Sequence, residues 1–169
     1  MELTHCSVAQ YRELEKFPVA VLLDNVRSMH NVGSVFRTSD AFMVEKVILS
    51  GITGCPPHPE ISKTALGADQ SVAWRYEKDA VKAVEDMKQE GWTLCVLEQT
   101  HGSIPLQDFN PDPDIKYLLV AGNEVEGVSQ DIVDLADIIL EIPQHGVKHS
   151  LNVSVSVGIA LWQMLGFRL

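Results

Sequence analysis

The sequence is short of cysteine, of basic residues and of long apolar runs, and each shortage excludes a class of protein. The three cysteines, Cys6, Cys55 and Cys95, are odd in number and widely spaced, so we expect free thiols rather than a disulfide framework. No segment approaches the roughly 18 consecutive apolar residues of a membrane span, and the first residues lack the basic-then-apolar pattern of a signal peptide. These absences predict a cytoplasmic protein without a membrane partner.

Basic residues are few: 13 Lys and Arg stand against 23 Asp and Glu, which gives a formal net charge of -10. Because Lys and Arg contacts to phosphate dominate non-specific affinity for nucleic acid, a broad nucleic-acid-binding surface and a DNA partner are not expected. The charge is unevenly distributed, however. No carboxylate side chain follows Glu141, whereas Lys148 and the titratable His145 and His149 do. A local positive pocket on an acidic body therefore stays open.

What the sequence does contain is an alternation of apolar runs and helical patterns. With 46% apolar residues, the chain can bury a sizeable core as one domain over 1–169. Ser7 and Gln10 form a capping-box pattern that predicts a short helix over 6–16, and residues 79–90 are strongly amphipathic. Apolar runs typical of strands buried on both faces span 19–24, 46–50, 71–76, 92–98, 116–122 and 137–143. The alternation predicts an α/β fold: a parallel sheet of about six strands with helices on both faces.

In parallel sheets ligands bind at the carboxyl ends of the strands, so the loops that follow the strands are the candidates for chemistry. The first, "DNVRSMHNVGSVFRT", lacks the Gly-rich turn of a dinucleotide site and has a single Gly33. Asn31 is expected to cap the helix that follows, with Arg37 nearly two turns further along. The alternative to a functional role for this pair is a cap and a surface arginine.

The second loop, "AGNEVEGVS", nearly matches the phosphate-binding G-x-x-x-x-G-K-[ST] pattern but has Val128 in place of the lysine. Glu124 and Glu126 would also repel a phosphate, so we do not expect a phosphate-binding loop. A glycine turn that holds a carboxylate suits a ligand with hydroxyls or an ammonium group. The alternative is a tight turn with solvated acidic side chains.

The third loop, "IPQHGVKHS", presents His145 and His149, and the segment "CPPH" adds Cys55 and His58. Cys and His at such spacings can ligate zinc. The two pairs lie on separate loops, so we expect no metal site. The surrounding segment 51–70 is rich in Gly and Pro and is expected to be mostly loop, although Ser62 could cap a turn of helix.

The C-terminal segment "SLNVSVSVGIALW" fits two patterns. Leu151 and Val153 alternate with polar residues as in a strand, whereas "GIALWQML" continues as a helix. A helix over 150–166 would place small residues on one stripe and large apolar residues on the adjacent stripe. We therefore expect a helix, with Ser150 and Asn152 in its first turn.

Three segments taken together resemble the three ordered motifs of the SpoU/TrmH-type branch of the SPOUT RNA methyltransferases. They are "NVGSVFRT" (31–38), "LLVAGNEVEGVS" (118–129) and "IPQHGVKHSLNVSVSVGIAL" (142–161). Their order, spacing and position after strands fit, and the resemblance covers nearly the whole chain from Val19 onward. It implies a SPOUT-like fold whose C-terminal segment threads through a loop as a trefoil knot, an exception to the rule that chains stay unknotted.

The resemblance also implies an activity: methyl transfer from S-adenosyl-L-methionine to a ribose 2′-hydroxyl in tRNA or rRNA, by a homodimer whose sites use residues of both subunits. The residues implied to bind the cofactor are Thr100, Gly122, Ile142, Gln144 and Leu151. By motif match, Arg37 is the catalytic arginine, Asn31 shapes its loop and Glu124 is the motif carboxylate. Ser150 and Asn152 would frame the substrate end.

Arg37 is a poor proton acceptor, because a guanidinium holds its proton under all ordinary conditions. We favour a role in binding the flanking phosphate and stabilising a developing alkoxide; the alternative is a general base.

The stretch before Val19 is too short for a separate RNA-binding domain, so RNA capture is expected to rest on the dimer's pooled cations, Arg27, Arg37, Lys63 and Lys148. Two other classes stay open: an α/β nucleotide-binding protein without methyl transfer, and a dimeric interaction protein in RNA maturation.

Overall fold

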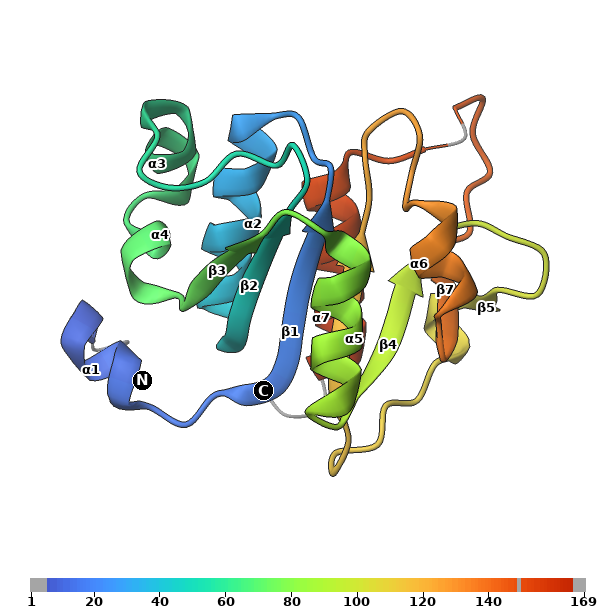
Figure 1. The fold of residues 1–169 in the computed structure, drawn as a ribbon, viewed down its shortest axis with the longest axis horizontal. Helices are drawn as coiled ribbons and strands as arrows, with labels where there is room; N and C mark the ends of the chain where they lie inside the picture. Colours follow the sequence, from blue (N-terminus) through green and yellow to red (C-terminus); the bar gives the residue numbers. More distant parts are fainter. Residues whose placement is uncertain (1–5, 149, 166–169) are drawn as a thin grey trace.

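The computed structural model describes residues 6–148 and 150–165. These residues form a seven-stranded sheet in the order β3-β2-β1-β6-β4-β7-β5, in which every neighbouring pair is parallel (Figure 1). The strands are β1 (Phe17–Asp24), β2 (Val44–Ser50), β3 (Trp74–Glu77), β4 (Trp92–Leu97), β5 (Ile104–Pro105), β6 (Lys116–Ala121) and β7 (Ile138–Glu141). The predicted α/β fold is confirmed. The strand beyond the six expected is β5, which has only two residues and therefore leaves no apolar run in the sequence.

Helices cover both faces of the sheet. In Figure 1, α5 crosses in front of the sheet and α7 passes behind it. The helices are α1 (Val8–Glu13), α2 (Met29–Ala41), α3 (Pro59–Ala65), α4 (Ala68–Ser71), α5 (Ala80–Gln89), α6 (Gln130–Asp134) and α7 (Val153–Leu165), with a 3-10 turn, η1 (Leu106–Asp108). Within the described part of the chain, no helix combines the length and the apolar character needed to cross a membrane.

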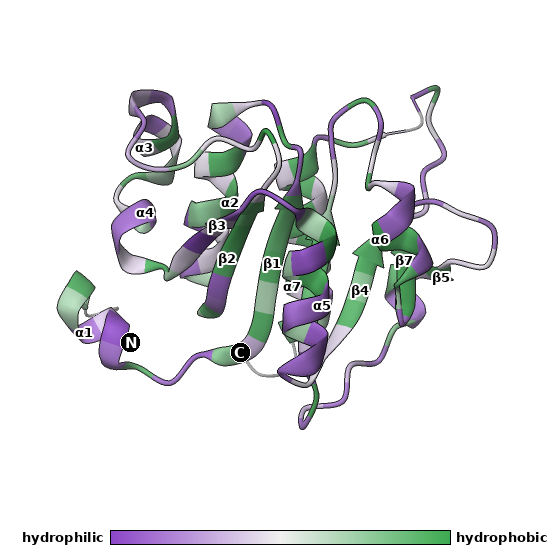
Figure 2. Cartoon of the chain, viewed as in Figure 1, coloured by the Kyte–Doolittle hydropathy of each residue, from purple (hydrophilic) through white to green (hydrophobic). Residues whose placement is uncertain are grey.

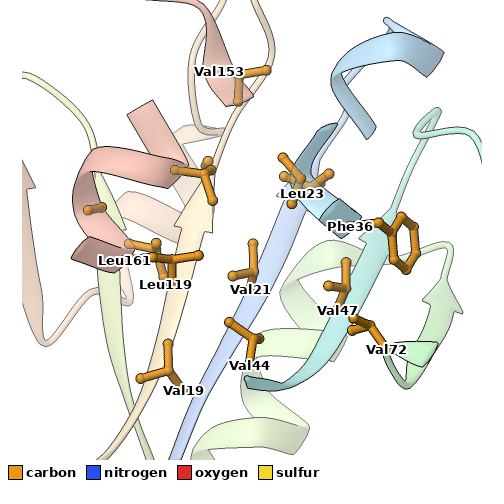
Figure 3. Packing of buried hydrophobic residues seen from close by; sticks show 14 of the residues in the cluster. Val19, Val21, Leu23, Phe36, Val44, Val47, Val72, Leu119, Val153 and Leu161 are labelled. Carbon is orange, nitrogen blue, oxygen red and sulfur yellow. The ribbon is translucent and has the colours of Figure 1, made fainter. Parts of the chain in front are cut away.

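The core consists of two apolar layers, one on each face of the sheet. In β1, Val21 and Leu23 belong to the layer shared with α2 and α7, whereas Ala20 and Leu22 belong to the layer under α5. Figure 3 shows the first layer, and Figure 2 shows apolar strands beneath helices with hydrophilic outer turns. Burial of one Leu or Val side chain contributes about 1.5–3 kcal/mol, and a one-residue slip would exchange the two faces of a strand. The packing therefore fixes the register of the strands, and with it the positions of their carboxyl ends relative to one another.

The segment 51–70 was expected to be mostly loop with one possible helical turn at Ser62. Residues 51–58 are loop, but α3 and α4 follow, so the helical part is longer than predicted and is capped by His58 rather than by Ser62. The Pro59 ring favours the first helical turn, and the His58 side chain accepts a backbone N–H of that turn. Gly33 allows α3 to approach α2 closely, because a Cβ atom there would clash with the side chain of Thr64. A proline-rich sequence thus starts a helix that packs on α2.

The N-terminal helix α1 is shorter than the predicted 6–16. Its capping box is present: Ser7 Oγ accepts the Gln10 N–H at 3.2 Å, and the Gln10 side chain accepts the Ser7 N–H at 2.8 Å. The buried Tyr11 donates its hydroxyl to the carbonyl of Asp40 at 3.3 Å. This bond ties α1 to the C-terminal half of α2.

The segment predicted as a helix over 150–166 is α7, which confirms a helix over a strand. Residue 166 lies outside the described residues. The helix begins at Val153, so Ser150 and Asn152 precede it rather than forming its first turn. The Asn152 side chain accepts the backbone N–H of Ser154 at 2.9 Å and caps the helix. Threading of this segment as a knot stays a prediction.

Candidate active site

A cavity lies at the carboxyl ends of β4, β6 and β7, where the parallel strands deliver their loops to one edge of the sheet. In Figure 1 this edge is at the top, where the arrowheads point and where the loops after β1, β6 and β7 gather. The cavity is lined by Leu97, Glu98, Gln99, Ala121, Gly122, Asn123, Glu124, Val125, Glu126, Gly127, Leu140, Glu141, Ile142, Gln144, Ser150, Leu151, Val153 and Ser156. Its position matches that of ligand sites in open parallel sheets.

The glycine loop after β6 is folded into a closed turn. The backbones of Asn123 and Gly127 exchange two hydrogen bonds, at 2.9 and 3.0 Å. Gly127 has a φ of +72°, which favours glycine. Gly122 also has to be glycine, because a Cβ atom there would clash with the backbone of Gly127 and Val128. The turn therefore exposes backbone atoms that no side chain covers to the cavity.

Glu98 is a further site residue that the sequence analysis missed. It follows β4, and its carboxylate accepts the Val128 N–H at 3.0 Å and the N–H of its neighbour Gln99 at 3.0 Å. The same carboxylate sits against Gly127, where a Cβ atom would collide with it. The available signal was an acidic residue directly after an apolar strand, at the edge where ligands bind. Glu98 supports the glycine loop from below and lines the cavity.

Glu124 joins the loop after β6 to the loop after β1. Its carboxylate accepts the backbone N–H groups of Arg27 at 3.2 Å and Ser28 at 3.1 Å, and the Asn31 side-chain amide at 3.2 Å. Burial raises the pKa of Glu124, but these hydrogen bonds to the ionised form outweigh burial and lower the pKa overall. Glu124 thus stays ionised, and its oxygens accept hydrogen bonds from backbone N–H groups. This arrangement suits a residue that positions the two loops better than a residue that transfers protons.

Asn31 connects all three motifs, though not as predicted. Ser28 caps α2 by accepting the Asn31 N–H at 3.3 Å, so the expectation that Asn31 is the cap was wrong. The Asn31 side chain instead donates to Glu124 and accepts the side-chain amide of Asn152 at 3.0 Å. A chain of side-chain hydrogen bonds therefore runs from the loop after β6, through α2, to the start of α7.

The structure brings most of the predicted cofactor residues to the cavity. Gly122, Ile142, Gln144 and Leu151 line it, as does Ser150 from the predicted catalytic set. Thr100 does not line it.

Arg37 lies away from the cavity. It is an exposed residue of α2 and lines a separate hollow beside α1, together with Tyr11 and Asp40. Across 6–148 and 150–165 no hydrogen bond or ion pair holds its guanidinium. Within one chain, Arg37 therefore does not reach the predicted cofactor position.

The cavity is acidic, contrary to the local positive pocket that the sequence left open. Its lining contains the carboxylates of Glu98, Glu124, Glu126 and Glu141, and no described Lys, Arg or His takes part. Lys148 is exposed and outside the lining, and Arg27 and Lys63 are also exposed. His149 lies outside the described residues. Among the described C-terminal cations, Lys148 and His145 flank the cavity in sequence, but neither lines it.

Among the described residues, no group of three or more Cys, His, Asp or Glu side chains is arranged to hold a metal ion. Cys55 is half-buried, and burial raises the pKa of its thiol; its Sγ contacts the Thr53 carbonyl at 3.7 Å. The hypothetical zinc ligands weighed above would also have included His149, which the structure does not describe.

Comparison with known proteins points to one family. Residues 18–162 match the family described as the SpoU rRNA Methylase family. A protein of Staphylococcus aureus named as a TrmH family tRNA/rRNA methyltransferase is 27% identical over 156 residues, which are 92% of this chain and 61% of that protein. The chain thus spans about three fifths of the length of such curated relatives.

Solved structures share the fold. The TrmH/SpoU tRNA modifying enzyme of A. aeolicus superposes with a TM-score of 0.83 at 27% identity, over 95% of this chain and 82% of that one. The AdoMet-bound rRNA methyltransferase of Sinorhizobium meliloti superposes with a TM-score of 0.85 at 24% identity, over 94% of this chain and 60% of that one.

Proposed function

Because this chain belongs to the SpoU rRNA Methylase family, we propose that it transfers a methyl group from S-adenosyl-L-methionine to a ribose 2′-hydroxyl of tRNA or rRNA. The observation that carries the proposal is the convergence of the three motif loops on one cavity, joined by the hydrogen bonds of Asn31 to Glu124 and Asn152. The sheet and its helices would act as one methyltransferase domain, and an RNA of the translation machinery would place the enzyme in the cytoplasm.

The cavity suits the proposed cofactor chemically. S-Adenosyl-L-methionine carries a sulfonium, an ammonium and ribose hydroxyls, for which carboxylates and bare backbone are appropriate partners. Gly122 offers the backbone, Glu98 and Glu141 offer carboxylates, and Ile142 and Leu151 offer apolar walls. When bound, the cofactor supplies a methyl group whose transfer leaves a neutral thioether. AdoMet in the related S. meliloti fold supports the same choice.

Arg37 requires a second subunit in this proposal. It does not line the cavity of its own chain. One face of α7 exposes large apolar side chains that a monomer leaves in water: Leu151 just before the helix, then Val155, Ile159 and Trp162, all 40% to 62% exposed. Burying them against a second copy would stabilise a homodimer, and a two-fold contact could bring the partner's α2 toward the cavity.

In such a dimer, Arg37 would act on the RNA rather than on the cofactor. Its planar guanidinium fits a phosphate beside the target nucleotide and can stabilise negative charge on the 2′-oxygen as the hydroxyl proton leaves. Ser150 and Asn152 would frame the hydroxyl at the mouth of the cavity. Arg27, Lys63 and Lys148 would contact phosphates outside it, so RNA affinity should fall steeply with salt.

The direct test is methylation of RNA by the purified protein. Total RNA from a strain lacking the protein would be incubated with isotopically labelled S-adenosyl-L-methionine, then digested and analysed by mass spectrometry. The proposal predicts label in a 2′-O-methylated nucleoside at one or a few positions. Label only on bases would refute the ribose target. Cofactor binding without transfer to any RNA would favour the non-catalytic nucleotide-binding or interaction protein.

A further inference from the structure

Within 6–148 and 150–165, no cation pairs with the carboxylates that line the cavity. Among the described residues, every hydrogen bond to Glu98, Glu124 or Glu141 comes from a neutral donor, and none of the ion pairs involves a residue of the cavity lining. Neutral donors satisfy oxygen lone pairs but leave the negative charge in place. The described lining of the cavity therefore carries negative charge that no described cation compensates.

Two of these carboxylates belong to residues that follow neighbouring strands, although they accept hydrogen bonds on opposite sides of the strand pair: Glu98 from Val128 after β6, and Glu141 from Ser103 before β5. β4 and β7 are adjacent parallel strands in which Leu97 pairs with Leu140, so Glu98 and Glu141 follow at neighbouring positions. The Glu98 N–H donates to the Leu140 carbonyl at 3.0 Å, which holds the two strand ends together. Adjacent strands are about 4.8 Å apart. Glu141 accepts only the Ser103 hydroxyl, at 2.8 Å, among the described donors.

Two half-buried carboxylates that line one cavity attract a cationic ligand more strongly than a neutral ligand of the same shape. We propose that Glu98 and Glu141 make the cavity select the cationic sulfonium donor over its neutral thioether product, S-adenosyl-L-homocysteine. The inference rests on the proposed function. The donor has a net charge of +1 and the product has none, while their shapes differ by one methyl group. The carboxylate pair therefore favours exchange of product for fresh donor.

Glu98 and Glu141 are the appropriate pair, because the other two carboxylates are placed differently. Glu124 is committed to the loop after β1 through three hydrogen bonds. Glu126 is exposed, where water and salt screen its charge. Glu98 and Glu141 are half-buried and stand at the ends of the two strands that form the floor.

The test is calorimetric titration of the intact protein with S-adenosyl-L-methionine and, separately, with S-adenosyl-L-homocysteine. Glu98→Gln and Glu141→Gln remove charge while keeping size and one acceptor oxygen. Glu85→Gln is the matched control, since Glu85 is exposed on α5 and outside the cavity lining. Thermal melts of all four proteins would verify that each variant is folded.

We expect the wild type to bind the donor on the order of tenfold more tightly than the product. Each cavity variant should reduce that ratio roughly three- to tenfold, through weaker donor binding at nearly constant product affinity. The control variant should leave the ratio of donor affinity to product affinity unchanged. Added salt should lower that ratio in the wild type, because it screens the carboxylates.

Equal affinity of the wild type for both ligands would overturn the inference and leave the proposed function intact. Gln variants that weaken both ligands alike would overturn it too, since the carboxylates would then act by shape and hydrogen bonding alone. Failure of the wild type to bind either ligand would overturn the proposed function as well.

Discussion

Two regions of the molecule carry the motif residues and differ in charge and construction. The cavity at the ends of β4, β6 and β7 is built from backbone turns and carboxylates, whereas the cations Arg27, Arg37 and Lys63 lie exposed on and around α2 and α3. A net charge of -10 therefore says little about either region. The first region suits a cationic cofactor and the second suits phosphate, so one acidic chain can attract both reactants to separate surfaces.

The two regions are joined by the side-chain hydrogen bonds of Asn31, in addition to the backbone N–H groups of Arg27 and Ser28 that bond Glu124. Asn31, on the side of the cations, hydrogen bonds both Glu124 and Asn152 on the side of the cavity. The link through Asn31 helps to set the position of α2 relative to the glycine loop. Disrupting either region, or the link between them, should therefore give distinguishable effects.

The largest effect is expected from Gly122→Ala, which breaks the cavity region. The added methyl group would clash with the backbone of Gly127 and Val128, so we expect a loss of stability of about 3 kcal/mol or more and no cofactor binding. Urea unfolding and calorimetry would measure both. Gly146→Ala is the control, because a Cβ atom there meets no described atom within 4 Å. A stable Gly122→Ala protein with normal cofactor affinity would show that the turn is not a close-packed cofactor platform.

Arg37→Ala should break the cationic region alone. Loss of transition-state charge stabilisation should lower kcat by about 10²- to 10³-fold, while cofactor affinity stays unchanged because Arg37 does not line the cavity. Arg37→Lys keeps the charge but loses the planar fork, and should also lose most turnover. Arg27→Lys is the control, with little change expected. Turnover of Arg37→Lys within a few-fold of the wild type would contradict the role.

The proposed sharing of each site between two subunits predicts complementation. In a mixed dimer, an Arg37→Ala subunit would contribute its cavity, and a subunit blocked by Gln144→Trp would contribute its arginine. One complete site per dimer should restore about half of the wild-type activity, by the two-fold symmetry of the contact. Homodimers of either variant should be inactive. No recovery on mixing would place the arginine in the same subunit as its cavity.

Separation of the subunits is expected from Ile159→Glu, which puts a charge on the exposed apolar stripe of α7. Sedimentation equilibrium should change from dimer to monomer, with cofactor binding reduced less than turnover. Ile52→Glu is the control, since Ile52 is 59% exposed and belongs to the loop after β2 rather than to α7. A dimer that survives Ile159→Glu unchanged would mean that another surface joins the subunits.

A smaller effect is expected from cutting the link. Asn152→Ala removes both the α7 cap and the bond to Asn31, which should cost about 1 kcal/mol of unfolding free energy. Asn152→Asp keeps an acceptor for the cap but cannot donate to Asn31, so it should be more stable than Asn152→Ala yet similarly impaired in turnover. Denaturation and initial rates would test this. Equal stability of the two variants would show that the cap contributes nothing.

The smallest effect concerns pH. Because the folded pKa of Glu124 is lower than the unfolded value of about 4.3, its ionised form adds stability at neutral pH. That contribution is lost as the pH falls below about 4.3 toward the folded pKa. The stability difference between wild type and Glu124→Gln should therefore shrink on acidification, measured by urea unfolding from about pH 7 to about pH 3 so that the range extends below the unfolded pKa. A difference that grows on acidification would reverse the assigned direction.

The local part of the fold could be predicted from sequence because it depends on neighbouring residues. Apolar runs marked the longer strands, the Ser7 box marked α1, and the pattern after Gly158 marked α7 as a helix. The two-residue strand β5 was missed, and α3 was expected only as a turn of helix at Ser62, since pairing with β7 and packing on α2 stabilise these elements rather than their own composition.

The site was predicted less completely, because side-chain direction depends on tertiary contacts. The motif match selected Gly122 and Leu151, which do line the cavity. It could not indicate that Lys148 stays outside while Glu98 faces inward, which follows from a turn and a strand pairing. Asn31 was assigned to its own helix, yet its side chain bonds residues about a hundred positions away.

The central claim is that the cofactor occupies the acidic cavity and not the hollow beside Arg37. A crystal structure of the protein soaked with S-adenosyl-L-methionine would test it most directly. We predict density against the backbone of Gly122, with the sulfonium near Glu98 and Glu141. Density in the hollow formed by Arg37, Tyr11 and Asp40, with the cavity empty, would contradict the account.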